Sequence, residues 1–153
     1  MTHSFERLKI GDKVETPTLH LAEENVRPMI RWAGYIHPLF SDPDYPATVG
    51  LPGCMVPGEV ILLVAGGLAE QVDVFDDSTI ALVEFESVQF KKPALVGDTL
   101  RLLMEVVDKR VSPSGRRGFI KFDWSCVNQD SQVLIKAAPI VAFKLPMAPS
   151  AAS

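Results

Sequence analysis

One segment constrains the fold more than any other. Residues 58–72, "GEVILLVAGGLAEQV", are apolar almost all the way round a helix. Such a helix is stable only if other elements cover most of its sides. Gly66 and Gly67 each cost about 1 kcal/mol relative to alanine inside a helix, which indicates that a sheet lies close against them. The sequence therefore predicts a buried central helix from about Gly58 to Gln71.

The chain after this helix has the two-residue alternation of strands. Strands are expected over residues 78–90, 98–110, 119–128 and 133–145, with turns at "SPSGRRG" and "NQDSQ". A change of phase in the first strand predicts a bulge near Ser87, and Pro139 is expected at an edge or a bulge. The side chains expected to point inward are Leu100, Leu102, Met104, Val106, Ile120, Phe122, Trp124 and Cys126. One buried helix followed by antiparallel strands predicts an α+β fold, with the sheet wrapped around the helix.

The chain before the helix is less regular. A short strand is predicted around residues 12–21, at an edge or kinked by a proline, followed by a short helix over residues 22–34. Five prolines between residues 35 and 57 indicate a loop-rich segment. A single domain is predicted over residues 1–145, with a disordered tail over residues 146–153.

Composition narrows the partners and the compartment. The 153 residues carry a formal net charge of −4, which argues against nucleic acid or an anionic membrane as the main partner. The N-terminus lacks an apolar signal segment, and the longest apolar run is too short to span a bilayer. Cys54 and Cys126 lack metal-binding spacing and fit free thiols in a reducing compartment. These features predict a cytoplasmic protein without a metal.

Two segments could carry chemistry. In "MVPGEV", Val56, Pro57 and Gly58 stand where the central helix begins, and the first amides of a helix can polarise a carbonyl oxygen. An ordinary helix start explains the same residues, because proline is common there. Lys91 and Lys92 could bind a phosphate, or they could form a solvated sheet edge.

Together, "AGYIHPLFSDPDY", "GCMVPGEVILLVAGGL" and "VEFESVQFKKPALVGDTLRLLMEV" resemble the MaoC-like branch of the hot-dog family, over residues 5–145. The resemblance implies a hot-dog fold, homodimers, and the lyase activity of (R)-specific enoyl-CoA hydratases and acyl-thioester dehydratases of fatty acid metabolism. It implies no cofactor beyond the CoA or acyl carrier protein that carries the thioester. It also implies that the Gly58 amide faces the thioester carbonyl, with Val56 and Pro57 beside it as substrate-binding residues.

The loop before the helix departs from the family pattern. Active members read G-D-x-N-P-L-H, and their aspartate and histidine act on a water and on the α-proton of the enoyl thioester. This sequence reads "GYIHPLF", so Tyr35 replaces the aspartate, His37 the asparagine and Phe40 the histidine. Phenylalanine cannot transfer a proton, and tyrosine, with an ordinary pKa near 10, is a poor base at neutral pH. The resemblance therefore predicts an altered acid/base set and little ordinary hydration.

Tyr35 and His37 are the catalytic candidates that remain. His37 could move a proton through a water while Tyr35 orients it, or it could fill the local hydrogen-bonding role of the asparagine. Asp42 and Asp44 lie in a proline-rich turn, where aspartates accept hydrogen bonds from backbone amides. Cys54 is expected to be a buried, unreactive thiol.

Three functions stay open on the sequence. The first is a hydratase or dehydratase with a rearranged acid/base set. The second is a non-catalytic acyl-thioester-binding module or partner subunit, and the third is a hot-dog thioesterase. The expected partners are the thioester and a second hot-dog chain, in a homodimer or a hetero-oligomer, and neither nucleic acid nor a membrane is expected.

Overall fold

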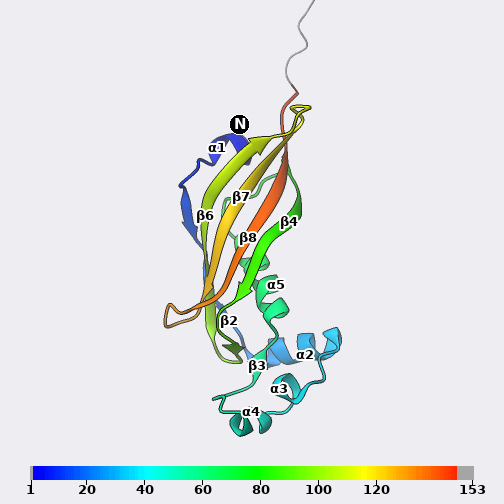
Figure 1. Ribbon diagram of the computed structural model, residues 1–153, viewed down its shortest axis with the longest axis vertical. Coiled ribbons are helices and arrows are strands. Elements are labelled where there is room, and N and C mark those ends of the chain that lie inside the picture. The colour runs from blue at the N-terminus through cyan, green and yellow to red at the C-terminus, as the bar shows by residue number, and fades with distance from the viewer. Residues whose placement is uncertain (1, 148–153) are drawn as a thin grey trace, which may run out of the picture.

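The computed structural model describes residues 2–147, which form five helices and eight strands (Figure 1). The helices are α1 (Ser4–Arg7), α2 (Glu23–Ala33), α3 (Pro38–Ser41), α4 (Tyr45–Thr48) and α5 (Gly58–Ala69). The strands are β1 (Lys13–Glu15), β2 (Leu19–His20), β3 (Met55–Val56), β4 (Thr79–Phe90), β5 (Ala94–Leu95), β6 (Thr99–Val111), β7 (Arg117–Val127) and β8 (Val133–Lys144). This order of elements confirms the predicted α+β class.

Six strands form one antiparallel sheet in the order β1-β6-β7-β8-β4, with β2 also paired to β6. The short strands β3 and β5 pair separately. Figure 1 shows α5 along one face of the large sheet, with α2, α3 and α4 grouped near the start of α5 and α1 at the opposite end of the sheet. The predicted arrangement of a sheet around a central helix is confirmed.

Helix α5 begins at Gly58, as predicted, and ends at Ala69, two residues before the predicted end. Its inner face is buried against the sheet through Val60, Ile61, Ala65, Leu68 and Ala69. Its outer face is open, because Leu63 is 63% exposed. Only Glu59, Leu63 and Gly67 of this helix are exposed, and its other residues are buried or half-buried, so the predicted burial on most sides is confirmed and one open stripe remains.

Gly66 and Gly67 lie where the sheet leaves room. An added Cβ atom at either position would meet no other atom within 4 Å. The prediction that a sheet packs closely against these glycines is wrong, because the sheet contacts the alanine and leucine side chains of the inner face instead.

The long strands have the predicted alternation. The inward side chains expected on β6 and β7 are all buried: Leu100, Leu102, Met104, Val106, Ile120, Phe122, Trp124 and Cys126. The register between β4 and β8 shifts between Phe85 and Val88, which confirms the bulge near Ser87. Pro139 lies opposite Phe85 at this irregularity, where a strand tolerates a residue without an amide donor.

The segment before α5 is partly helical. The predicted helix is α2, and Gly34 ends it in the left-handed conformation with a φ of 88°. Within the predicted loop, the single-turn helices α3 and α4 were missed. The predicted disordered tail falls largely on residues 148–153, which lie outside the described residues, and Pro146 and Met147 have no regular secondary structure. None of the helices within residues 2–147 is both long enough and apolar enough to cross a membrane.

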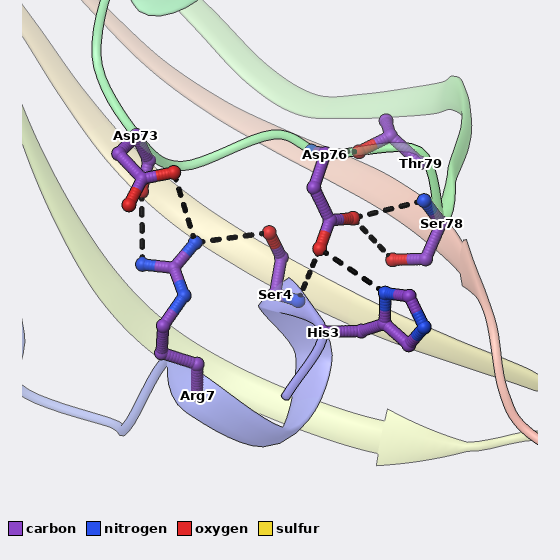
Figure 2. A network of polar contacts seen from close by, with 7 residues as sticks. All are labelled: His3, Ser4, Arg7, Asp73, Asp76, Ser78 and Thr79. Atoms are coloured by element: carbon purple, nitrogen blue, oxygen red, sulfur yellow. Dashed lines mark hydrogen bonds and ion pairs between the residues drawn. The ribbon is translucent and has the colours of Figure 1, made fainter. Parts of the chain in front are cut away.

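The N-terminal helix α1, which was also missed, is tied to the loop after α5 by a polar network (Figure 2). One carboxylate oxygen of Asp76 accepts a hydrogen bond from the Ser4 amide at 2.8 Å and lies 3.4 Å from Nδ1 of His3. The other oxygen accepts from the amide and the hydroxyl of Ser78. Arg7 donates to the carbonyl oxygen of Asp73 at 2.9 Å. We call these six residues, His3, Ser4, Arg7, Asp73, Asp76 and Ser78, the N-terminal anchor.

Candidate functional site at the start of α5

The start of α5 has amides without protein partners. Pro57 caps the helix, and its carbonyl oxygen accepts hydrogen bonds from the amides of Val60 at 2.9 Å and Ile61 at 3.2 Å. Within residues 2–147, no hydrogen bond satisfies the amide of Gly58 or of Glu59. The first amides of a helix lack intrahelical acceptors and carry the positive end of its dipole. They are available to an oxygen atom of a ligand.

A pocket of about 340 Å³ lies at this helix start. Its lining includes Val56, Gly58, Glu59, Phe90, Lys91 and Lys92. The ring of Phe90 lies over Gly58 so closely that a Cβ atom at residue 58 would come within 2.5 Å of it. Glycine is therefore the residue that lets the ring, the helix start and the two lysines share one pocket.

Tyr35 contacts the helix start from the loop that follows α2. Its hydroxyl donates a hydrogen bond to Oε2 of Glu59 at 3.1 Å, and its ring packs edge-on against Phe40 with the ring centroids 5.5 Å apart. Desolvation, followed by the hydrogen bond to Glu59, raises the pKa of the Tyr35 phenol above its ordinary value. Tyr35 therefore stays protonated at neutral pH and acts as a donor rather than as a base.

His37 is engaged within its own loop. Its Nδ1 accepts a hydrogen bond from the Leu39 amide at 3.1 Å and caps α3. Its ring packs edge-on against Phe40 and Tyr45, with centroids 6.3 and 6.0 Å away. Because the cap uses the lone pair of Nδ1, the neutral ring carries its proton on Nε2. These contacts fit the second alternative given for His37 above, the local hydrogen-bonding role of the asparagine that it replaces.

The other candidates of the loop have structural contacts. Asp42 accepts a hydrogen bond from the Asp44 amide at 2.9 Å, which is the turn-capping role expected from the sequence. Cys54 is buried, and its thiol lies 3.7 Å from the Asp42 carbonyl oxygen.

The second cysteine, Cys126, lies on β7, and burial raises the pKa of its thiol to about 11. Within residues 2–147, no cluster of histidine, cysteine and carboxylate side chains could hold a metal ion.

A second hollow, the outer groove, runs along the open face of α5. It measures about 470 Å³ and is bordered by Leu62, Leu63, Gly66, Gly67, Phe75, Thr79, Leu82, Phe85, Trp124 and Val141, with Glu59 and Glu70 also lining it. The helical spacing of Glu59, Leu62 and Gly66 places them along one stripe of α5, and Glu70 continues this stripe as the residue that caps the end of the helix. Glu59 lines both the outer groove and the pocket at the helix start, so its carboxylate lies at the border of each.

Sequence reasoning found Gly58, Val56 and the lysines but missed Glu59. Val56 and Gly58 line the pocket, whereas Pro57 contributes the cap. A single acidic residue in the first turn of a helix is common, because it interacts favourably with the dipole. The signal that could have found Glu59 is that it is the only charged residue of an otherwise apolar helix from Gly58 to Ala69.

Comparison with known sequences finds similarity to a dehydratase. No family model matches this sequence. The chain is 30% identical over 97 residues to the 3-hydroxyacyl-(acyl-carrier-protein) dehydratase FabZ of Solibacter usitatus. The match covers 63% of this chain and 57% of the relative, so it spans little more than half the length of that protein.

Comparison with solved structures covers nearly the whole chain. A monoamine oxidase regulatory protein from Archaeoglobus has a TM-score of 0.85 at 23% identity, over 94% of this chain and 95% of that one. The (R)-hydratase of A. caviae has a TM-score of 0.72 at 22% identity, over 91% and 98% of the chains. A MaoC-like dehydratase from Rhodospirillum rubrum has a TM-score of 0.75 at 19% identity, over 93% and 97%. The chain thus has the hot-dog fold of MaoC-like dehydratases and (R)-hydratases, which confirms the resemblance predicted from the sequence.

Proposed function

We propose that this chain binds an acyl thioester at the start of α5 and hydrates enoyl thioesters, or dehydrates 3-hydroxyacyl thioesters, carried by CoA or acyl carrier protein. One observation carries the proposal: a pocket with two helix amides that have no partner within residues 2–147 shares one lining residue, the carboxylate Glu59, with an apolar groove. A thioester has the matching parts, which are a polar carbonyl, an apolar acyl chain and a carrier arm with phosphates.

The surroundings of the site give each part of the thioester its place. The carbonyl oxygen accepts hydrogen bonds from the amides of Gly58 and Glu59, which stabilise the negative charge that forms there during the reaction. Lys91 and Lys92, which line the same pocket, face the phosphates of the carrier. The acyl chain lies in the outer groove, and no resident metal or cofactor takes part.

The relatives support this class of reaction. FabZ is a dehydratase of 3-hydroxyacyl carrier-protein thioesters, and the protein of A. caviae is an (R)-hydratase. Because Tyr35 and Phe40 replace the acid and base of active members, we expect native turnover below that of such enzymes. The two alternative functions, a non-catalytic acyl-thioester-binding module and a thioesterase, are distinguished by the experiment described next.

The test is a titration of the purified chain with crotonyl-CoA, followed by assays of enoyl absorbance and of free thiol. We expect saturable binding, slow loss of enoyl absorbance, and no release of free thiol. The double variant Lys91→Ala, Lys92→Ala should weaken binding about two- to fivefold at low salt, the range of exposed charge pairs. Lys13→Ala, an exposed lysine on β1, is the matched control. Absence of binding overturns the proposal, and free thiol identifies a thioesterase.

The free edge of the sheet favours a second hot-dog chain as the partner. The simplest such partner is another copy of this chain. Strand β4 ends the sheet and exposes Ile80, Leu82, Val83 and Phe90 by 46% to 55%. Long apolar edge strands are liable to pair with another chain. Sedimentation should therefore give twice the 16.8 kDa mass of one chain. Val83→Lys should give monomers, whereas Val111→Lys, equally exposed on β6, should not.

A further inference from the structure

We propose that Glu59 is the catalytic proton-transfer residue of this site and that Tyr35 positions it. The proposal rests on the proposed function, because it assigns a group to the reaction at the same thioester. The loop lacks the acid and base of the family pattern. A carboxylate on α5, that of Glu59, is hydrogen-bonded to Tyr35, which replaces the missing aspartate.

Position is the first argument. If the thioester carbonyl lies at the amides of Gly58 and Glu59 and the acyl chain lies in the outer groove, the chain must cross from one hollow to the other. Glu59 is the one residue that appears in the linings of both hollows. The α- and β-carbons follow the carbonyl directly, so the two carbons that react lie at this crossing, beside the Glu59 carboxylate.

The hydrogen bond from Tyr35 is the second argument. It occupies Oε2 of Glu59, at 3.1 Å, while Oε1 has no hydrogen-bond partner within residues 2–147 and is available to a water molecule. The ring of Tyr35 is held by Phe40, whose carbonyl oxygen in turn accepts a hydrogen bond from Arg27. Phe40 therefore supports the orientation of Tyr35 and, through it, of the carboxylate. Catalytic geometry requires this kind of support for the reacting side chain.

The reaction balances with this one group. The Glu59 carboxylate takes a proton from water while the water oxygen bonds to the β-carbon. The electron pair of the double bond moves toward the α-carbon and the thioester oxygen, where the helix amides stabilise it. The Glu59 carboxyl then returns the proton to the α-carbon, which restores the carboxylate. One water is added in total, and dehydration is the reverse.

The test measures binding and turnover separately on the full chain. Glu59→Gln should keep the crotonyl-CoA dissociation constant within about threefold but lower kcat by about 10²-fold or more, the contribution of one positioned acid–base group. Tyr35→Phe should lower kcat by about tenfold with little change in KM, because the carboxylate stays but loses its orientation. Glu24→Gln, which removes an exposed carboxylate from the first turn of α2, is the matched control and should change neither.

Three outcomes are decisive. The proposal is supported if Glu59→Gln lowers kcat as expected and if kcat of this variant no longer depends on pH in the way that kcat of the native chain does. If native chain and Glu59→Gln turn over equally, or if neither turns over although both bind crotonyl-CoA, Glu59 is not the proton-transfer residue and thioester binding still stands. Absence of binding by the native chain overturns the proposed function as well. Thermal melting of each variant separates these results from unfolding.

Discussion

The two ends of the molecule treat their polar groups in opposite ways. At the N-terminal anchor, both oxygens of the Asp76 carboxylate accept hydrogen bonds from the chain itself (Figure 2). At the start of α5, the amides of Gly58 and Glu59 have no protein acceptor within residues 2–147, and a pocket lies in front of them. A polar group satisfied by its own chain stabilises the fold, whereas one that faces a pocket is available to a ligand.

The largest expected effect comes from changing the open end. The variant Tyr35→Asp, His37→Asn, Phe40→His restores the acid and base of the family pattern. We expect crotonyl-CoA hydration to rise about 10²-fold, because a positioned general acid or base contributes at least that much. Loss of enoyl absorbance measures the rate, and equal crotonyl-CoA affinity in both proteins is the control.

An unchanged or lower rate in this variant would contradict the assignment of the loop. The new aspartate would lie beside Glu59, and two neighbouring carboxylates favour one shared proton. The double variant His37→Asn, Phe40→His separates the two explanations, since it supplies the histidine and keeps the capping acceptor of α3 but adds no second carboxylate.

The next effect concerns the closed end. Asp76→Ala leaves the Ser4 amide and the Ser78 groups without their acceptor, so the free energy of unfolding should fall by about 1–3 kcal/mol. Turnover of native-like folded protein should not change, because the anchor lies at the opposite end of the sheet (Figure 1). Urea denaturation at pH 7 measures the loss. Asp73→Ala, which removes an 89% exposed carboxylate, is the matched control and should cost much less.

The pH dependence of the same variant gives a second measurement. Desolvation opposes ionisation of Asp76, but the hydrogen bonds from Ser78 and Ser4 outweigh it and hold its pKa well below the ordinary range. A depressed folded-state pKa stabilises the protein above the ordinary carboxyl pKa of about 3.9, and this stabilisation is lost as the pH falls below it. The stability gap between native protein and Asp76→Ala should therefore narrow below about pH 4. A constant gap would contradict an ionised anchor.

The two ends also differ in how much of them could be predicted from the sequence. The sheet and α5 were predictable because alternation and an apolar run reflect burial directly, and the phase change near Ser87 located the bulge. The single-turn helices α1, α3 and α4 are too short to produce a period. The hydrogen bond between Tyr35 and Glu59 joins residues 24 apart in the chain, and no local pattern reports such a contact.

The glycines of α5 show the same limit, and they supply the smallest expected effect. Sequence indicates that a helical glycine is costly, but it cannot tell whether a neighbour or open space explains it. Since an added Cβ atom at Gly66 or Gly67 meets no atom within 4 Å, Gly66→Ala and Gly67→Ala should each raise the free energy of unfolding by about 0.5–1 kcal/mol. Urea denaturation of the two variants measures this gain.

Gly118→Ala is the opposing control, taken from the closed end. A Cβ atom there would come within 2.4 Å of the Phe5 ring, so the variant should be destabilised by about 1–3 kcal/mol, as overpacked sites are. If Gly66→Ala and Gly67→Ala are destabilised in the same way, a surface absent from the single chain must lie against them. Their stability should then depend on protein concentration, because only a second chain could supply that surface. Stabilisation that is independent of concentration would instead mean that the outer groove stays open to an acyl chain.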